Sequence, residues 1–366
     1  GRCGNNRERS LLMDTLYPSD LKRYSRREFI RLAAQSLAGF FALPLLEAPT
    51  PRTAFLDPTQ ERQGRILNNQ ASLYASPSFS STFIKVFHFD RIVPITAITI
   101  GDQEPAYNRI WYQINNEGWV HSGSVQPVEI SPMSPLRKIP EKGFLGEICV
   151  PYTDAVWHYR RPTSIAYRFY YSTTHWVTGV SVDSRDQVWY HVPDDKWGYT
   201  YYVDARHLRP LSAEQLSPLS PHVPAEEKRI EIHLDEQVLI AYEGSQAVFM
   251  SRTATGARFR DGDFTTRKGR YITNRKRPSR HMAAGDAAAP NSYDLPGVPW
   301  VSYLTKSGVA IHGTFWHNDF GKPRSHGCIN VSSRASHWIY RWTMPEVPKG
   351  EQTWAAEDGT RVDVMD

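Results

Sequence analysis

Cysteine is scarce in this chain, and its scarcity excludes two classes of protein. Only three cysteines occur among 366 residues, and they lie far apart at Cys3, Cys149 and Cys328. An odd number of widely spaced cysteines does not form the framework of a disulfide-stabilised domain, and it does not supply the ligands of a cysteine-rich zinc site. The role of each cysteine must therefore be argued separately.

The chain also lacks a long uninterrupted apolar run. Its most apolar stretch, residues 32–46, is broken by Gln35 and Pro44, and it is shorter than the ~20 residues that span a bilayer comfortably. This stretch follows Arg26 and Arg27, a pattern that resembles a twin-arginine export signal. We therefore expect a protein exported by the twin-arginine route, with a cleaved signal favoured over a membrane anchor formed by residues 32–46. The alternative is an amphipathic N-terminal helix with a chance Arg-Arg pair.

Charge of one sign is not in large excess. The composition restricts the possible fold classes more than it restricts the possible binding partners. A net charge of +5 favours an anionic partner but does not choose between nucleic acid and a cell-wall polymer. A hydrophobic content of 40%, with 12% aromatic residues and 26 prolines, favours a soluble protein rich in strands and turns over a helical bundle. The length allows two or three domains, because a typical domain has ~100 to 150 residues.

Two regions in the first half of the chain have the pattern of small β-barrels. Residues 67–128 contain short alternating stretches separated by Pro, Gly, Asn and Asp, and residues 144–211 repeat this pattern more loosely. The first region resembles the bacterial Src-homology-3-like domain in the residues that end it: Trp111, Tyr112, Ile114, Gly118, Trp119 and Val120. The second region ends in a similar series: Trp189, Tyr190, Val192, Tyr201, Val203 and Leu208. We expect these aromatic residues to pack in the barrels or at their rims, and not to form a ligand platform.

The last third of the chain predicts further strands and one helix. Alternating or apolar stretches predict strands over residues 230–234, 238–242, 247–252, 269–274 and 309–313. Residues 332–343 predict a helix, because Trp338, Ile339 and Trp342 share one face and Ser332 or Ser333 is well placed as its N-cap. This helix directly follows the most informative motif of the chain, S-H-G-C-I-N at residues 325–330.

Cys328 in this motif has the neighbours that a nucleophilic thiol needs. A thiol attacks acyl groups as its thiolate, and a free cysteine with a pKa of ~8.5 is only slightly ionised at neutral pH, so it needs a base. His326 is two residues away and projects to the same side of an extended chain. His312 lies upstream across a loop that is long enough to fold back. The residues alone do not rank the two histidines. Gly327 leaves room for a substrate, and the amides of Gly327 and Cys328 are candidate oxyanion donors.

Other interpretations of Cys328 are weaker. An inert buried thiol is common in proteins, but Ser325, His326, Gly327 and Asn330 are unusual neighbours for a core residue. A metal site is the third alternative, although its candidate ligands do not match the standard spacings of a zinc site: His312, His317, His326 and Cys328.

The two motifs together resemble the signature of the L,D-transpeptidases of bacterial cell-wall synthesis. That signature is a histidine, a spacer, and then S/T-H-G-C followed by a hydrophobic residue and N or R; here I-H-G occupies residues 311–313 and S-H-G-C-I-N occupies residues 325–330. The resemblance covers about residues 228–348. It includes Asp235–Gln237, Ser251–Gly256, Trp300, Trp316, Trp338 and Tyr340. One departure is Arg267, which stands where the family more often has proline.

The resemblance implies a role for each residue of the site. Cys328 is the nucleophile, and His312 is the general base, oriented through the carbonyl of Gly313. Gly327 and Cys328 supply the oxyanion donors, with Ser325 and His326 as support. The residues expected to contact the substrate are Trp316, Arg324, Asn330 and Tyr303.

The resemblance also implies the reaction and its partners. We expect acyl transfer on peptidoglycan stem peptides, which releases D-alanine and links third-position residues, with no metal, no organic cofactor and no nucleic acid. The basic residues of 267–280 would attract stem carboxylates or anionic wall polymers, unless they are only a solvated face. Location in the cell wall or periplasm, a monomer and a covalent adduct with carbapenems are further expectations. The alternatives are a thiol peptidase of the L,D-carboxypeptidase type and a non-catalytic wall-binding protein.

These arguments predict a mainly β protein with two small Src-homology-3-like barrels and a β-sandwich-like catalytic domain that has a helix after the cysteine. The predicted segments are an N-terminal segment with the signal at 1–48, a linker at 49–65, barrels at 66–140 and 141–212, a Ser/Pro-rich linker at 213–227, the catalytic domain at 228–348 and a C-terminal tail at 349–366.

Overall fold

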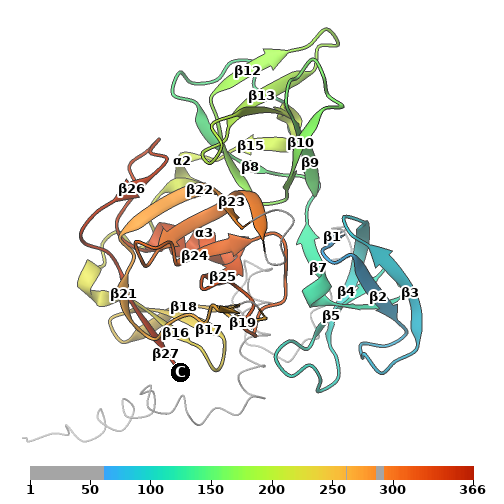
Figure 1. Cartoon of the computed structure of the whole chain (residues 1–366), viewed down its shortest axis with the longest axis vertical. Helices are drawn as coiled ribbons and strands as arrows, with labels where there is room; N and C mark the ends of the chain where they lie inside the picture. Colours follow the sequence, from blue (N-terminus) through green and yellow to red (C-terminus); the bar gives the residue numbers. More distant parts are fainter. Residues whose placement is uncertain (1–61, 261, 286–291) are drawn as a thin grey trace, which may run out of the picture. The chain divides into compact units, whose positions relative to one another are not determined.

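The computed structural model describes residues 62–366 except 261 and 286–291. These residues belong to one compact unit and are mainly β-structure (Figure 1). The export signal predicted at 1–48 lies outside the described residues, as does most of the linker predicted at 49–65. Among the described residues, no helix is both long and apolar enough to cross a membrane.

Residues 62–128 form the first β-module, a seven-stranded sheet with the order β3-β2-β6-β5-β4-β1-β7. Its buried residues alternate along the strands and form one core, which includes Leu73, Ile95 and Val120. Its strands are β1 (Arg62–Ile66), β2 (Gln70–Tyr74), β3 (Phe83–His88), β4 (Ile92–Ile100), β5 (Ile110–Ile114), β6 (Gly118–His121) and β7 (Val125–Val128).

One boundary of this module differs from the prediction. β1 begins at Arg62, inside the range predicted as a linker, and pairs with β4 on one side and β7 on the other. The sequence does not predict this strand, because Arg62, Gln63 and Arg65 are polar and give it no apolar alternation. Its position is determined by hydrogen bonds to both neighbouring strands.

Residues 144–210 form the second β-module, which has two sheets with the orders β10-β9-β14-β13-β12 and β11-β8-β15. Tyr190, Tyr201 and Leu208 lie in its buried core, as predicted. The likeness of both modules to bacterial Src-homology-3 domains stays a prediction. The strands are β8 (Phe144–Ile148), β9 (Tyr152–Val156), β10 (Ile165–Tyr170), β11 (Thr174–Val177), β12 (Gly179–Val182), β13 (Val188–Pro193), β14 (Thr200–Asp204) and β15 (Leu208–Pro210).

The chain from α2 onward forms the third module, with two five-stranded sheets of the orders β18-β17-β16-β27-β21 and β25-β24-β23-β22-β26. One apolar core contains residues of both sheets and of helix α3. The elements are α2 (Ala213–Leu216), β16 (Lys228–His233), β17 (Val238–Glu243), β18 (Gln246–Arg252), β19 (Arg258–Phe259), β20 (Gly262–Asp263), β21 (Gly269–Ile272), β22 (Arg275–Ala284), β23 (Tyr293–Tyr303), β24 (Ala310–Thr314), β25 (Ile329–Ser332), α3 (Ser333–Trp342), β26 (Trp354–Ala355) and β27 (Arg361–Met365).

The helix predicted after the cysteine motif is confirmed. The Ser332 hydroxyl accepts a hydrogen bond from the Ala335 amide at 3.2 Å, which makes Ser332 the N-cap. Ile339 and Trp342 are buried in the core, and the Trp338 ring stacks on Phe249 with 4.1 Å between ring centroids. The apolar face of α3 therefore joins the two sheets.

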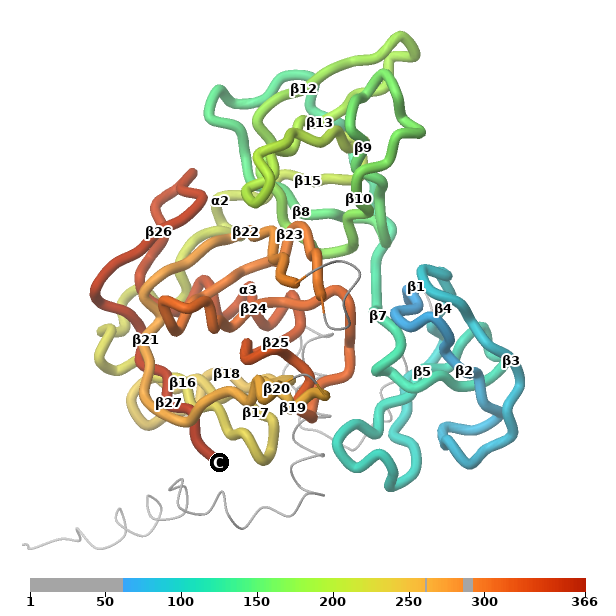
Figure 2. Tube along the Cα trace, viewed as in Figure 1, coloured from blue at the N-terminus to red at the C-terminus, as the bar shows by residue number. Residues whose placement is uncertain are grey.

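The segment predicted as a C-terminal tail, 349–366, is instead part of the third module. β27 lies inside its sheet, parallel to β16 and antiparallel to β21, and Figure 2 labels it next to β16. Val362 and Val364 are buried in the same core as α3. Two alternating valines are too short a pattern to predict a central strand, so the predicted end of the catalytic domain at 348 was too early.

Candidate active site

The cysteine motif and the I-H-G motif meet on two adjacent strands. β24 and β25 are neighbours in the sheet (Figure 1) and pair in parallel, with Ile311 opposite Ile329 and His312 opposite Asn330. Because side chains alternate along a strand, the isoleucines enter the core with α3. Ala310 packs with Cys328 in a second apolar cluster on the opposite face. The pairing therefore brings His312 to the face where Cys328 lies.

Gly313 is needed where α3 crosses β24. A Cβ atom at this position would lie 2.6 Å from the Ser336 hydroxyl and 2.9 Å from the Cα of Ser333. Both distances are too short for any side chain, so only glycine lets the helix pack this closely on the strand. The glycine of I-H-G thus sets the distance between the helix and the strand that carries His312.

Cys328 is half-buried, and its thiol lies against backbone. Its Sγ is 3.7 Å from the carbonyl oxygen of Gly308, and its apolar neighbours include Tyr303 and Phe315. Burial raises the pKa of the Cys328 thiol to about 11, an effect that a hydrogen bond with the Ala310 backbone partly opposes. The resting thiol is therefore protonated at neutral pH and needs a base before it can attack.

His312 has the tautomer and protonation state that such a base needs. Its Nδ1 lies 3.0 Å from the carbonyl oxygen of Gly313, and because a carbonyl only accepts, Nδ1 carries the hydrogen and Nε2 keeps its lone pair. Burial lowers the pKa of His312 to about 4, so the ring is neutral at pH 7. The contact predicted for Gly313 is present, and the catalytic role of His312 stays a prediction.

His326 lies in a different environment, among aromatic rings. Its ring stacks on Phe259 at 4.8 Å and meets Phe264 at 4.7 Å and Tyr293 at 5.9 Å between centroids. Its Nε2 is buried and has no hydrogen-bond partner among the described residues. These contacts favour the shaping role predicted for His326, because the aromatic rings hold the imidazole without a group that would orient it as a base.

The turn before Cys328 is fixed by side-chain hydroxyls. Gly327 has a φ of 109°, a conformation that favours glycine. Its carbonyl accepts a hydrogen bond from Thr266 Oγ1 at 2.9 Å, and its amide donates to Ser325 Oγ at 3.2 Å. Ser325 Oγ in turn donates to the Cys328 carbonyl. The Gly327 amide must therefore exchange its bond to Ser325 before it can act as an oxyanion donor.

Two of the predicted substrate-binding residues, Trp316 and Tyr303, lie beside Cys328. Both belong to the apolar cluster that contains Cys328. The Trp316 ring centroid is 5.9 Å from that of His312, and the guanidinium of Arg275 lies 3.9 Å above the Tyr303 ring. Their positions are compatible with contact to a substrate at Cys328.

The other two predicted substrate-binding residues are occupied elsewhere. Arg324 is exposed and forms an ion pair with Asp319 at 3.1 Å. Asn330 is only 2% exposed, and its Nδ2 lies 3.0 Å from Nε2 of His317. Asn330 is therefore placed to support the loop that contains His317, which does not favour the substrate contact predicted for it.

The basic residues of 267–280 do not form one free cationic face. Five of the seven basic side chains have polar partners: Lys268 pairs with Asp366, Arg270 with Asp363, Arg277 and Arg280 with Asp195, and Lys276 binds the carbonyls of Thr343 and Pro345. Most of the charge is thus neutralised or buried, which weakens the predicted attraction to anionic polymers.

Sequence reasoning missed the aromatic wall around His326. Phe259 ends β19, Phe264 follows β20, and Tyr293 begins β23. The signal that was available is the pair of phenylalanines in the otherwise polar stretch 258–265. Two isolated apolar residues do not identify their partner, because the contact forms only when β19 and the turn before Cys328 come together.

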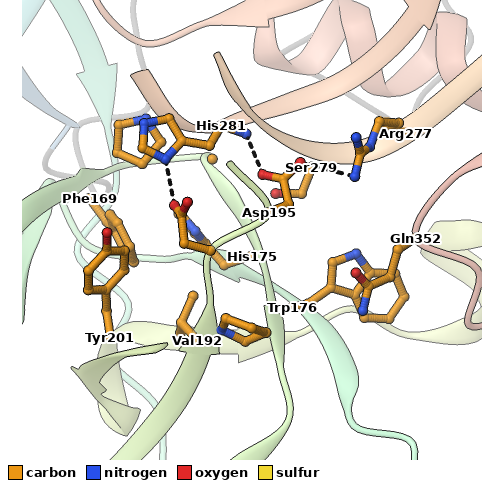
Figure 3. A pocket seen from close by; sticks show the side chains of 14 residues that line it. Phe169, His175, Trp176, Val192, Asp195, Tyr201, Arg277, Ser279, His281 and Gln352 are labelled. Carbon is orange, nitrogen blue, oxygen red and sulfur yellow. Dashed lines mark hydrogen bonds and ion pairs between the residues drawn. The ribbon is translucent and has the colours of Figure 1, made fainter. Parts of the chain in front are cut away.

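In the described part of the chain, two hollows that adjoin the third module have linings without Cys328. One is a cavity of about 20 Å³, which has room for about one water. Figure 3 shows His281, Asp195 and Arg277 around it, and the His281 amide donates to Asp195 Oδ1 at 2.8 Å. The other, of about 370 Å³, is lined by Arg275, Thr305 and Lys306 among others. It adjoins the turn whose Gly308 carbonyl contacts the thiol.

The structure gives no support to the metal-site alternative. Within the part of the chain that is described, no group of three or more His, Cys, Asp or Glu side chains could hold a metal ion. His326 is held among Phe259 and Phe264, whereas His317 pairs with Asn330.

Comparison with known proteins identifies the third module. Residues 227–364 match the family model of the L,D-transpeptidase catalytic domain, YkuD. The matched range ends inside β27, in agreement with the position of that strand in the sheet. No match was found among curated proteins. Residues 227–364 are therefore similar to an L,D-transpeptidase catalytic domain.

Several solved structures of L,D-transpeptidases are similar to this chain. L,D-transpeptidase 3 from Mycobacterium tuberculosis, in complex with a faropenem-derived adduct, is 18% identical over 38% of this chain and 60% of that chain, with a TM-score of 0.31. The enzyme from Xylanimonas cellulosilytica is 23% identical over 43% of this chain and 64% of that chain, with a TM-score of 0.27. An L,D-transpeptidase from Mycobacterium smegmatis is 15% identical over 74% of this chain and 100% of that chain, with a TM-score of 0.32. The chain spans less than two thirds of the first two relatives.

Proposed function

We propose that this protein is an exported, cysteine-dependent L,D-transpeptidase that cross-links peptidoglycan stem peptides. The observation that carries the proposal is the pairing of β24 and β25, which brings His312 and Cys328 to one face of a sheet within the matched catalytic domain. Export is part of the proposal because peptidoglycan lies outside the cytoplasmic membrane, and because Arg26 and Arg27 precede an apolar stretch.

The first half of the reaction forms a thioester. Cys328 Sγ attacks the carbonyl carbon between the third and fourth residues of a tetrapeptide stem, while Nε2 of His312 accepts the thiol proton. The tetrahedral intermediate then expels D-alanine, whose amine takes the proton back from His312. The acyl group of the third residue remains on sulfur.

The second half transfers this acyl group to an amine. The side-chain amine of a second stem attacks the thioester carbon, His312 accepts the amine proton, and Cys328 leaves with that proton as a thiol. The product is an amide between two third-position residues. Each amide of the oxyanion site, Gly327 and Cys328, would lower the barriers by roughly 3 kcal/mol.

The pKa values of the two groups determine when the proton moves. With the pKa of Cys328 at about 11 and that of His312 at about 4, the resting pair is a neutral thiol and a neutral imidazole. A thiolate–imidazolium pair is therefore not stored in the free enzyme. The proton moves to His312 as sulfur attacks, and the bound substrate supplies the partner that makes this transfer favourable.

The experiment that tests the proposal compares two acyl acceptors. Purified protein is incubated with a tetrapeptide stem, alone and with a second stem that carries the acceptor amine, and the products are separated by mass. We expect a cross-linked dimer and released D-alanine. Release of tripeptide without any dimer would identify a thiol peptidase that uses water, and no reaction with any stem would contradict an enzymatic role.

A further inference from the structure

The loop between the two catalytic strands is bound by the first β-module. Residues 315–322, called here the active-site loop, follow β24 and precede the turn to Cys328. Asn318 Nδ2 in this loop donates hydrogen bonds to the carbonyls of Ser122 at 3.2 Å and Val125 at 3.0 Å. The contact is close, because a Cβ atom on Gly123 would lie 2.7 Å from the carboxylate of Asp319.

Arg65 of β1 is the central residue of this contact. It is 1% exposed, and it forms an ion pair with Asp90 at 2.8 Å and a hydrogen bond from Nη2 to Gln126 at 2.8 Å. The same Nη2 donates to the carbonyl oxygen of Phe315, the first residue of the active-site loop. One buried guanidinium therefore joins the first module to the loop.

The second module completes the surroundings of Arg65. The guanidinium lies 4.1 Å above the ring of Tyr170, and this ring stacks on Phe315 at 5.3 Å between centroids. Arg168 adds a second ion pair to Asp90 at 3.1 Å. Arg65, Tyr170 and Phe315 thus come from three modules and meet at one point.

Phe315 connects this point to the active site through ring contacts. Its ring lies in the apolar cluster that includes Cys328, and it meets Trp316 edge-on at 5.1 Å. The Trp316 ring is in turn 5.9 Å from His312. A displacement of the Phe315 backbone would therefore be transmitted to the residues that surround the nucleophile and its base.

We propose that Arg65 is a positioning residue that holds the active-site loop so that Trp316 and His312 keep their places beside Cys328. The planar guanidinium presents donors in fixed directions, so it binds Asp90, Gln126 and the Phe315 carbonyl together only when the loop is in place. The proposal rests on the proposed function, because its readout is acylation of Cys328. It gives the first β-module a task in catalysis.

The test measures acylation of the full-length protein by a carbapenem, with intact mass followed over time at several inhibitor concentrations. Arg65→Met removes every polar contact, whereas Arg65→Lys keeps the charge but lacks the planar fork. We expect the maximal acylation rate to fall about 10- to 100-fold in Arg65→Met, with less loss in Arg65→Lys. The concentration for half-maximal rate should change little, because Arg65 is 1% exposed and therefore out of reach of the inhibitor.

A matched control is Arg209→Met in the second module. Arg209 pairs with Glu147 at 2.6 Å, as Arg65 pairs with Asp90, but it makes no contact with the active-site loop among the interactions described. Its maximal acylation rate should equal that of the wild type. A fall in the rate of Arg209→Met as large as that of Arg65→Met would show that general destabilisation causes both, and it would overturn the proposal.

A second variant protects the test if changes at Arg65 prevent folding. Asn318→Ala removes the hydrogen bonds to Ser122 and Val125 but leaves Arg65 and its partners unchanged. It should also lower the maximal acylation rate, and the amides of residues 313–322 should exchange hydrogen faster. If folded Arg65→Lys and Asn318→Ala both acylate at the wild-type rate, the proposal is wrong and the proposed function stands. If the wild type forms no adduct at Cys328, the proposed function and this inference both fail.

Discussion

The two cysteines in the described part of the chain both have a thiol pKa that burial raises, but their neighbours differ. Cys149, which directly follows β8, is 2% exposed, and its Sγ lies 3.7 Å from the Arg206 carbonyl. Cys328 lies 3.7 Å from the Gly308 carbonyl. Burial raises the pKa of both thiols. A buried, protonated thiol is therefore common to both sites and does not identify a nucleophile.

The difference lies in what surrounds each thiol. Cys328 has a neutral histidine on the adjacent strand, a glycine turn and a half-open position. Cys149 lies between Ile148 and Val150 of an apolar core. We expect the reactivity of Cys328 to come from the neighbouring base and from access to the thiol, and the predictions below test this difference between the two cysteines.

The largest effect is expected from removal of the base. His312→Ala should lower the acylation rate of Cys328 by about 10²- to 10⁴-fold, because the variant lacks the neutral imidazole that accepts the thiol proton in the proposed mechanism. His326→Ala should have a smaller effect, because its ring lies among Phe259 and Phe264. Time courses of adduct formation by intact mass measure both; loss of acylation only in His326→Ala would reverse the assignment.

The second effect concerns pH. Because burial raises the pKa of Cys328 to about 11, the thiolate fraction of the free enzyme grows about tenfold for each pH unit between pH 7 and pH 9. Alkylation by iodoacetamide should therefore become about 100-fold faster over this range. The measurement uses a Cys3→Ser background, so that only the described cysteines contribute. An alkylation rate that stays constant between pH 7 and pH 9 would show that the free enzyme already contains the thiolate at pH 7.

A smaller effect is expected at Gly327. Its φ of 109° is unfavourable for any residue with a Cβ, although the nearest atom to such a Cβ would be 3.6 Å away. The cost of Gly327→Ala is therefore backbone strain of about 1 to 3 kcal/mol, and acylation should slow about tenfold as the turn shifts. Stability by chemical denaturation and acylation rates together test this; an unchanged rate would remove Gly327 from the oxyanion site.

The smallest effect is expected at the second cysteine. Cys149→Ala leaves the base, the turn and the loop untouched, so acylation by a carbapenem should equal that of the wild type. Its cost should be limited to stability, of about 1 kcal/mol, because a small buried group is lost. A slower acylation rate in a stable Cys149→Ala protein would contradict the comparison on which these predictions rest.

The sequence predicted those parts of the fold and site that depend on local patterns. The helix over 332–343 follows from its apolar face and its serine cap, whereas the Gly313 contact of His312 was implied by the family resemblance. β27 was missed because only Val362 and Val364 alternate there. Arg65 was missed because its contact with Phe315 joins residues 250 positions apart, and no local pattern contains that information.

The site was predicted least well where roles depend on burial. Asn330 was expected to contact the substrate, yet it is buried beneath the loop with His317. Arg324 was expected there too, but it pairs with Asp319. A motif gives the identity of a polar side chain, whereas its partner is decided by the packing of β24, β25 and the loop between them.

The central claim, that Cys328 is the nucleophile, is tested most directly by the intact mass of the protein after incubation with a carbapenem. The account predicts one covalent addition to the wild type and to Cys149→Ala, and none to Cys328→Ala. A single addition that persists in Cys328→Ala would contradict it.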